Sequence, residues 1–367
     1  MSRPGYDDVV LLTGLPGLRA RHVLRELVRA PRTHVIALVT AEERSGVEAS
    51  LDGAAAARVD FLEGDASAMD LGLSGAELRV LAATVDRIHH VAIATDPATP
   101  KALAVKTNVG AAREVLELAE MTESLRALVF HSSVTVSGQR EGLVLEDDPV
   151  PREGFRNDAE ETMARAERMM REATKVPVVV ARAGLVVGDS TTGEFDGLEG
   201  FYLLVLLIMT SPREIAIPLP SRGDAPLHLV PVDYVARAAC ALGRDARAVG
   251  RTVHLVDPSP LSARRVLELV AQATGRRMGP GFLPANVTKA LLNVPGIDRL
   301  ARSPRAVLDA LVSRVTYGRE AQAELLAGTG VTCPPFEQYV ETLVDAVRRR
   351  QGERQERRDA HFDDPLG

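Results

Sequence analysis

The sequence predicts an α/β fold in which a parallel sheet is covered by helices on both faces and is followed by a smaller, mostly helical C-terminal part. Three observations support this prediction. Apolar runs of strand length alternate with segments of helical periodicity, a glycine-rich turn follows the first run, and the pattern becomes mainly helical after Ser262. With 367 residues, 46% of them hydrophobic, the chain can bury a substantial core.

Apolar runs bounded by turn residues predict the strands of the sheet. They are Val9–Leu12, Val35–Val39, Ile88–Ile93, Ala127–Phe130, Val178–Ala181 and Thr252–Val256. Helical patterns follow at Gly17–Ala30, Ser74–Ala83, Lys101–Met121, Asp158–Ala173 and Val232–Leu242. Beyond Ser262 the predicted helices are Val266–Ala273, Ala306–Val315 and Phe336–Arg349. Because parallel strands need crossover connections, this alternation is typical of a doubly wound sheet.

Composition and charge exclude several classes of protein. The net charge of -6 and the absence of a basic run interleaved with aromatic residues argue against nucleic acid as a partner. The longest apolar stretch, Phe201–Met209, is too short to span a bilayer, which needs about 20 residues, and the N-terminus has no signal-peptide pattern. We therefore expect a cytoplasmic protein in which Cys240 and Cys333 are buried thiols, with no metal site.

The first apolar run leads into a glycine-rich turn and then a helix. The turn residues expected to hold a dinucleotide are Thr13, Gly14, Leu15, Pro16, Gly17 and Leu18. Gly14 permits a tight turn, Gly17 lets the backbone approach a pyrophosphate at the positive helix N-terminus, and the small Ala20 stands where the helix packs on the strand. The spacing alone would also suit a turn shaped only by glycine and proline, so further motifs must support the interpretation.

Further motifs follow in a consistent order along the chain. Gly64-Asp65-Ala66 comes after a third strand-like segment, and His90-Val91-Ala92-Ile93 ends the next one. Asn108-Val109-Gly110 lies in a helix, Ser132-Ser133-Val134-Thr135 ends a strand, and Arg182-Ala183-Gly184 precedes Gly188-Asp189-Ser190. Together with Val230-Pro231-Val232-Asp233-Tyr234, these segments resemble the extended short-chain dehydrogenases/reductases, in the branch that includes thioester and fatty acyl reductases.

The resemblance covers roughly residues 9 to 260 and implies a Rossmann-type fold with assigned roles for several residues. Ser133 would be the catalytic serine, with Thr135 beside it. Cofactor contacts would come from Asp65 near the adenine and from Ala66, Ala92, Asn108, Arg182 and Ala183. The implied organisation is a dinucleotide-binding domain over residues 1–190, a cap segment over 191–226, a return to the first domain over 227–260, a helical substrate cap over 261–350 and a disordered tail over 351–367.

One family feature is missing from the sequence. Where the family has its catalytic Tyr-x-x-x-Lys, this chain has Ala159 and Met163, and none of its lysines follows any tyrosine by four residues. The tyrosine would protonate the substrate oxygen, and the lysine one turn on would lower its pKa from about 10. Ala159 and Met163 share one helix face, so we expect an apolar wall beside the nicotinamide. Thr95 replaces a second tyrosine, and Ala183 a proline.

The cofactor preference depends on the end of the second strand, at Thr40. No acidic residue stands there to bind a free ribose 2′-hydroxyl, and Arg44 or Arg19 could bind a 2′-phosphate. NADP(H) is therefore favoured over NAD(H).

For a spare proton donor, His228 is better placed than His131, although a structural role is the more common one for a histidine. Phe201 and Tyr202 begin an apolar helix that suits either the protein core or the wall of a hydrophobic substrate pocket.

Two functions remain open at this point. The first is an atypical reductase that acts on a hydrophobic carbonyl, enone or acyl-type small molecule, by reduction or a related rearrangement. In it Ser133, water or the substrate supplies the proton. The second is a non-catalytic NADP(H)-binding sensor or complex partner. The retained Ser133 favours the enzyme, and a homodimer is compatible with either. The sequence does not identify the substrate.

Overall fold

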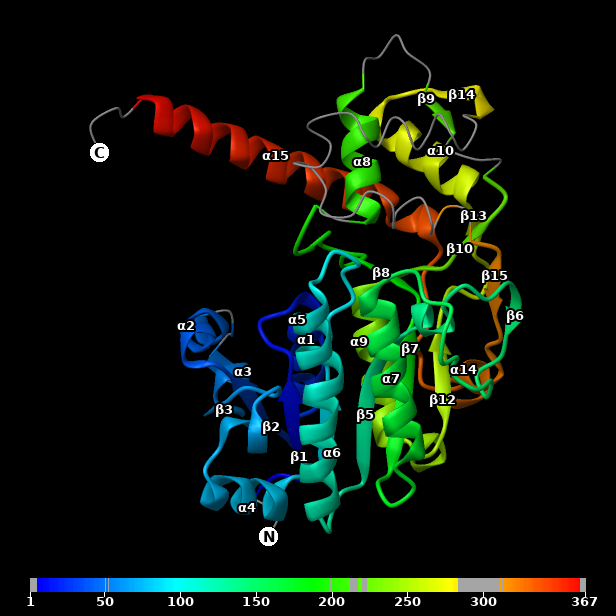
Figure 1. The fold of residues 1–367 in the computed structure, drawn as a ribbon. Helices are drawn as coiled ribbons and strands as arrows, with labels where there is room; N and C mark the ends of the chain where they lie inside the picture. The colour runs from blue at the N-terminus through cyan, green and yellow to red at the C-terminus, as the bar shows by residue number, and fades with distance from the viewer. Residues whose placement is uncertain are drawn as a thin grey trace. The chain divides into compact units, whose positions relative to one another are not determined.

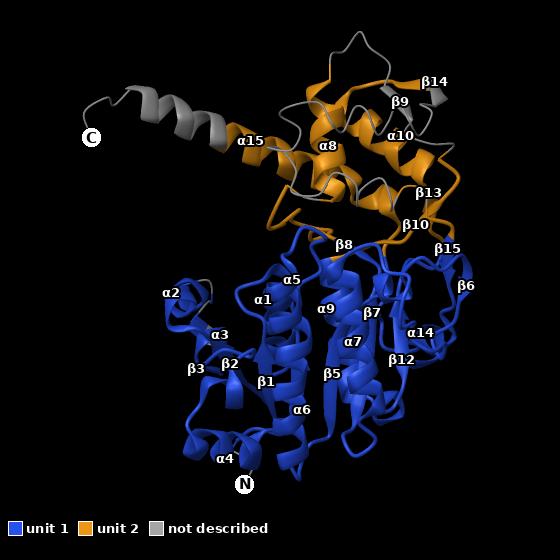
Figure 2. Ribbon diagram, in the orientation of Figure 1, with its two compact units in different colours: residues 1–186, 232–258, 315–333 blue, residues 187–231, 259–314, 334–367 orange. Residues whose placement is uncertain are grey.

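The computed structural model describes residues 5–49, 51, 53–198, 200–211, 217–219, 223–282, 311 and 313–363. The chain divides into two compact units, shown in two colours in Figure 2. Unit 1 comprises residues 1–186, 232–258 and 315–333, and unit 2 comprises residues 187–231, 259–314 and 334–367.

Unit 1 is built on a seven-stranded parallel sheet of order β12-β7-β5-β4-β1-β2-β3 (Figure 1). Its strands are β1 (Asp8–Thr13), β2 (Thr33–Val39), β3 (Val59–Glu63), β4 (Arg87–His90), β5 (Ala127–Ser133), β7 (Val178–Ala183) and β12 (Thr252–Leu255). The predicted doubly wound parallel sheet is confirmed. β4 is shorter than predicted, because the amide groups of Val91 and Ala92 bond to the Thr13 hydroxyl instead of continuing a ladder.

Helices cover both faces of this sheet and form two separate cores. On one face α1 (Leu18–Arg29) packs on β1 and β2 and α9 (Val232–Arg244) packs on β5 and β7, with Val23, Leu27 and Cys240 among the buried residues. On the other face α4 (Gly75–Thr84), α6 (Ala111–Met121) and α7 (Asp158–Glu172) pack on β4, β5 and β7. Every central strand is therefore covered on both sides, which explains why the runs are continuously apolar.

Shorter elements complete unit 1. They are α2 (Ala41–Ala49), α3 (Gly53–Ala56), η1 (Met69–Gly72), α5 (Lys101–Ala104), the π-helical η2 (Val105–Gly110), η3 (Val134–Ser137), β6 (Gly142–Val144), β8 (Leu185–Val187), which continues into unit 2, and η4 (Ala246–Ala248). The predicted helix over 101–121 is thus three elements. A π-bulge commonly marks a site where a side chain is re-aimed, and here η2 carries Asn108.

A late segment of the chain also belongs to unit 1. Residues 315–333 contain β15 (Val315–Tyr317), which pairs in parallel with β6, and α14 (Glu320–Leu325), which packs on β12. The Glu146 carboxylate accepts hydrogen bonds from the amides of His254, Ala321 and Gln322 at 2.9, 2.6 and 3.2 Å. The sequence pattern predicts this segment as part of the helical cap. The difference arises because these contacts join residues far apart in the sequence.

Unit 2 is mainly helical. It contains α8 (Phe201–Thr210), α10 (Ala263–Thr274), η5 (Phe336–Gln338) and α15 (Val340–Asp363), with the short strands β9 (Ile217–Leu219), β10 (Pro226–Leu227), β11 (Leu229–Pro231), β13 (Leu261–Ser262) and β14 (Met278–Phe282). Helix α15 covers residues 351–363, where the sequence predicts disorder; the predicted helix at 306–315 falls largely outside the described residues. No helix among those described is long and apolar enough to cross a membrane.

A buried ion pair joins helix α7 to the sheet in unit 1. The Arg182 guanidinium, on β7, contacts the Glu167 carboxylate of α7 at 2.5 Å, and both side chains are almost fully buried. Glu167 also accepts a hydrogen bond from the Ser132 hydroxyl at 2.6 Å. Arg182 Nη1 contacts His254 Nε2 at 3.2 Å, and His254 Nδ1 contacts the Gly318 carbonyl at 2.6 Å.

We predict that Glu167→Gln lowers the free energy of unfolding by about 3–5 kcal/mol, because Arg182 would be left as a buried charge without its counter-ion. Urea denaturation of the whole chain measures this loss. Glu161→Gln on the same helix is the matched control, since Glu161 pairs with the exposed Lys101 at 3.8 Å and should cost below about 1 kcal/mol. Equal losses in both variants would contradict the assigned role of Glu167.

Candidate active site

The glycine-rich turn after β1 packs directly against the end of β4. Thr13 Oγ1 lies 2.9 Å from His90 Nδ1 and accepts hydrogen bonds from the amides of Val91 and Ala92 at 3.2 and 3.4 Å. Gly14 has a φ of 94°, and a Cβ atom there would lie 2.6 Å from the Val91 carbonyl carbon. Only glycine fits this position.

The turn leads into a helix N-terminus that suits an anion. Gly17 is the N-cap residue of α1; no side chain caps this helix start, and its first turn contains no acidic residue. Leu15 is buried, whereas Pro16 and Gly17 are exposed. Because the first amide groups of a helix and its dipole attract negative charge, a phosphate group fits here.

A second feature of the helix start also fits an anionic ligand. Burial lowers the pKa of Arg19, the second residue of α1, to about 10. Its Nη1 atom is buried and has no hydrogen-bond partner among the described residues. The residues of this turn therefore fit a dinucleotide phosphate, on geometry and on charge.

Asp65 and Asn108 hold the loops that follow β3 and β4. Asp65 accepts hydrogen bonds from the Ser67 amide and hydroxyl at 2.9 and 2.6 Å and pairs with Lys106 at 3.1 Å. Although partial burial raises it, these bonds and the Lys106 charge keep the pKa of Asp65 below its usual value. Asn108 bonds both backbone groups of Ala94, at 2.7 and 2.9 Å, and so fixes the loop that carries the exposed Thr95. Ala66 is partly buried and packs against the apolar core that α4, α6 and α7 form on the sheet.

The end of β2 carries a carboxylate that the sequence analysis missed. Glu43 accepts hydrogen bonds from the Thr40 amide and hydroxyl at 3.2 and 2.8 Å. The signal was Thr-x-x-Glu, the pattern of a capping box at the start of α2. An acidic group therefore does stand at this strand end, contributed by the helix and not by the strand.

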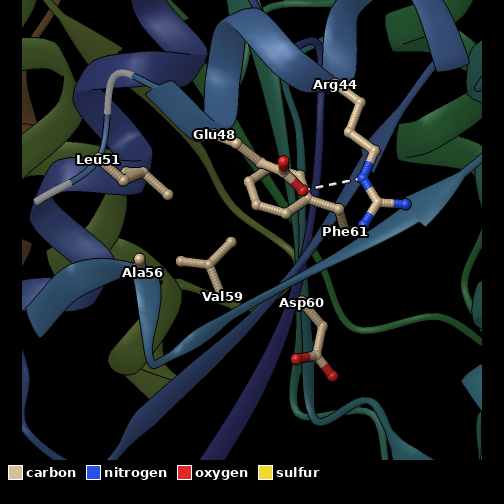
Figure 3. Close-up of a pocket in the computed structure, with 7 residues that line it drawn as sticks. All are labelled: Arg44, Glu48, Leu51, Ala56, Val59, Asp60 and Phe61. Carbon is tan, nitrogen blue, oxygen red and sulfur yellow. Dashed lines mark hydrogen bonds and ion pairs between the residues drawn. The ribbon is translucent and has the colours of Figure 1, made fainter. Parts of the chain in front are cut away.

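Arg44 lies on the outer side of α2, beside an edge pocket of about 550 Å³. Figure 3 shows Arg44 with Glu48 and Phe61 around this pocket. The Arg44 guanidinium pairs with Glu48 at 2.8 Å and lies 6.0 Å from the centre of the Phe61 ring. Both members of the pair are largely exposed, so Arg44 can exchange Glu48 for another anion at small cost.

Ser133 ends β5, at the carboxyl edge of the sheet two strands from the glycine-rich turn. Its hydroxyl accepts hydrogen bonds from the Thr135 amide and hydroxyl at 3.3 and 2.9 Å. Two predicted catalytic residues are therefore brought together. Functional groups in open α/β sheets gather at this edge, which supports the predicted location.

The helix face at the two substituted positions is buried and apolar. Asn157 caps α7 by accepting a hydrogen bond from the Glu160 amide at 2.9 Å. Ala159 and Met163 are 2% and 1% exposed, and Met163 belongs to the core formed on β4, β5 and β7. Between them, the Thr162 hydroxyl receives a hydrogen bond from Asn108 at 2.9 Å. That the two side chains form a wall of the nicotinamide site stays a prediction.

The other predicted residues are held by contacts within the fold, and the binding roles expected of them stay predictions. The Arg182 side chain is held by Glu167 and His254 as described above, and Ala183 is buried at the end of β7. In unit 2 the Tyr202 ring stacks on Phe195, and its hydroxyl accepts a hydrogen bond from the Gly188 amide at 2.6 Å. Phe201 packs edge-on against Phe336. His228 is buried in unit 2, and its role as a proton donor stays a prediction.

Buried histidines lie beneath the carboxyl edge of β4 and β5. His89 Nδ1 contacts His131 Nε2 at 3.2 Å, whereas His90 stacks on Phe130 on the other face. Burial, together with the charges of Arg244 and Arg87, lowers the pKa of His89 to about 3, and burial lowers that of His90 to about 4. Among the described residues no group of three His, Cys, Asp or Glu side chains could hold a metal ion.

A family of proteins described as Male sterility protein matches this chain over residues 12–239, which include the glycine-rich turn, Ser133 and α7. The chain belongs to this family. A glycine betaine reductase from Emericella nidulans is 29% identical over 280 residues, and the match covers 71% of this chain and 22% of the relative. A carboxylic acid reductase from Mycobacterium tuberculosis is 27% identical over 286 residues, covering 68% of this chain and 24% of the relative.

The chain thus spans about a quarter of the length of these two relatives. Among solved structures, the terminal R domain from the myxalamid PKS-NRPS biosynthetic pathway superposes with a TM-score of 0.81 at 25% identity. That match covers 95% of this chain and 92% of the R domain. The similarity to this R domain therefore extends across nearly the whole fold.

We predict that stability falls as the pH drops below about 6.5. His89, His90 and His131 have lowered pKa values in the folded state, so the unfolded chain binds more protons, and the stability present above pH 6.5 is lost on acidification. Each fully neutral histidine should contribute a slope of about 1.4 kcal/mol per pH unit. Urea denaturation between about pH 7.5 and 5 measures the slope. His131→Asn should reduce it, and an unchanged slope in this variant would contradict the assignment.

Proposed function

We propose that this member of the Male sterility protein family is an oxidoreductase that binds a nicotinamide dinucleotide and acts on a hydrophobic carbonyl, enone or acyl-type small molecule. It does so by reduction or a related rearrangement, without a Tyr-Lys acid. The observation that carries the proposal is the Ser133–Thr135 hydroxyl pair at the carboxyl edge of a sheet whose first turn fits a dinucleotide phosphate. The named reductases among its relatives support the same class of reaction.

Loss of the tyrosine leaves most of the catalytic potential in place. A bound reduced nicotinamide would supply a hydride to the substrate. A general acid contributes about 10²- to 10⁴-fold to the rate, or ~3–5 kcal/mol, whereas orientation of two reactants contributes ~7–11 kcal/mol. Ser133 can donate a hydrogen bond to the substrate oxygen, since Thr135 donates to Ser133 and leaves its proton available. The buried apolar surface of Ala159 and Met163 suits a larger hydrophobic substrate.

For the cofactor we propose a preference for NADP(H) over NAD(H). Arg44 is exposed and pairs with the surface carboxylate of Glu48, so a 2′-phosphate can replace that partner. Glu43 opposes this preference, because its carboxylate lies at Thr40, where a ribose hydroxyl is usually bound.

A second candidate function is a non-catalytic NADP(H)-binding sensor or complex partner. The observation that favours it is the burial of Met163 in the apolar core beneath α7, at a position where its side chain supplies no ionisable group to assist catalysis. Cofactor binding without turnover on any hydrophobic aldehyde, enone or acyl thioester would support the sensor.

We predict that Arg44→Ala weakens NADPH binding and leaves NADH binding unchanged, because only NADPH carries the 2′-phosphate. Glu43→Gln should have the opposite effect on NADPH and strengthen its binding, since a carboxylate is removed from the same strand end. A charge-assisted hydrogen bond is worth roughly 1.5–3 kcal/mol, or about 10- to 150-fold in affinity. Calorimetry with both reduced cofactors measures these effects. Equal loss of NADH and NADPH binding in Arg44→Ala would argue against a phosphate contact.

We predict that Ser133→Ala lowers turnover by about 10²- to 10³-fold, the usual loss when one oxyanion-type donor is removed. The fold should be retained. Turnover is measured as cofactor oxidation across a panel of hydrophobic aldehydes, enones and acyl thioesters. Ser137→Ala, which removes a hydroxyl from the same 3-10 turn that bonds the Val134 carbonyl, is the control and should keep most activity.

The double variant Ala159→Tyr with Met163→Lys completes this test. If the pocket holds a larger ligand, a phenol would fill substrate volume, and the double variant should gain no activity. Full activity in Ser133→Ala together with a gain in the double variant would instead identify an ordinary reductase site that has been damaged, and would refute the proposed role of Ser133.

A further inference from the structure

Arg19 is a charged residue on the buried face of a helix. It lies one turn before Val23, and residues four apart share a helix face, so Arg19 continues the buried stripe of α1 formed by Val23 and Leu27. Its Nη1 atom is buried, although the residue as a whole is only partly so. Helix α1 thus carries a guanidinium into the layer between itself and the sheet.

The charge of Arg19 acts on a residue of a neighbouring strand, β5. The Arg19 charge is one of the causes that lower the pKa of His131, after burial and the neighbouring His89. His131 belongs to β5, which lies two strands from β1 on the side away from β2. The Arg19 guanidinium is therefore close enough to His131 for its charge to act at β5. The end of β2, where an adenosine 2′-phosphate would be bound, is on the opposite side.

Nothing in the described part of the chain neutralises this charge. No ion pair joins Arg19 to an acidic side chain among the described residues, and its Nη1 atom has no hydrogen-bond acceptor. His89 and His131 are held neutral by burial, so they supply no negative charge. Arg182, the comparable buried arginine, is paired with Glu167 at 2.5 Å. A buried charge without a partner is destabilising, so a bound anion is its expected counter-ion.

We propose that Arg19 binds the pyrophosphate of the dinucleotide, at the phosphate on the nicotinamide side. The proposal rests on the dinucleotide binding of the proposed function and adds a side-chain contact to the backbone amides of the turn. The pyrophosphate is common to NAD(H), NADP(H) and ADP-ribose. Arg19 therefore sets the affinity for all three, whereas Arg44 would distinguish between the two cofactors.

The test uses Arg19→Met, which keeps the length of the side chain and removes its charge. Calorimetry is expected to show that NADH, NADPH and ADP-ribose bind about 10- to 100-fold more weakly to this variant, each by a similar factor. AMP, which has only the phosphate on the adenosine side, should bind equally to both proteins. Arg29→Met, at the exposed end of the same helix, is the matched control and should change none of these affinities.

Thermal unfolding without ligand gives an independent readout. Arg19→Met should raise the melting temperature by about 2 °C or more, since it removes an uncompensated buried charge. A purely structural arginine would give the opposite sign. Unchanged ADP-ribose affinity, or a lower melting temperature with unchanged affinities, would overturn the role of Arg19 while leaving the proposed function intact. Failure of the wild-type protein to bind any dinucleotide would overturn both.

Discussion

The buried ion pair between Glu167 and Arg182 is the interaction on which the candidate site most depends. It fixes α7 against β7, and through the Ser132 hydroxyl it also fixes the last residues of strand β5. Ser133 follows directly, and Ala159 and Met163 lie on the same α7. Two charges buried together are tolerated only when each finds partners, which here are Ser132 and His254. The pair therefore specifies a geometry more than it adds stability.

The same network extends to a segment that returns from far along the chain. His254 bonds the Gly318 carbonyl, and Glu146 binds three backbone amides, two of them at the start of α14. Burial raises the pKa of Glu146 above its usual value in spite of those hydrogen bonds. Residues 315–333, which we call the strap, thus contact β12 through α14 and pair with β6 through β15. These polar contacts cover β12, the edge strand of the sheet. An uncovered edge strand could pair with a strand of another chain.

Local patterns predicted the sheet and the elements that carry Gly14, Asp65, Asn108 and Ser133, because three of these belong to short motifs at strand ends and Asn108 to a short motif in a helix. Contacts between distant residues were not predictable in this way. The strap residues, the Glu167–Arg182 pair and the Glu43 carboxylate at Thr40 depend on tertiary packing or on a helix cap. The inward direction of Arg19 belongs to the same class, because helical periodicity gives its face but not the strand it approaches.

The two substituted positions on α7 show how burial and chemistry are coupled. Met163 packs in an apolar core with Phe130 and Val136, at 1% exposure. A lysine at this position would pay the cost of desolvation, which only a neighbouring phenol, carboxylate or bound ligand could offset. Without a tyrosine at position 159 that compensation is reduced, so an apolar residue at 163 is the more stable choice. The polar Ser133–Thr135 pair, which carries no charge and in which the Thr135 hydroxyl donates to Ser133, faces no such penalty and is retained.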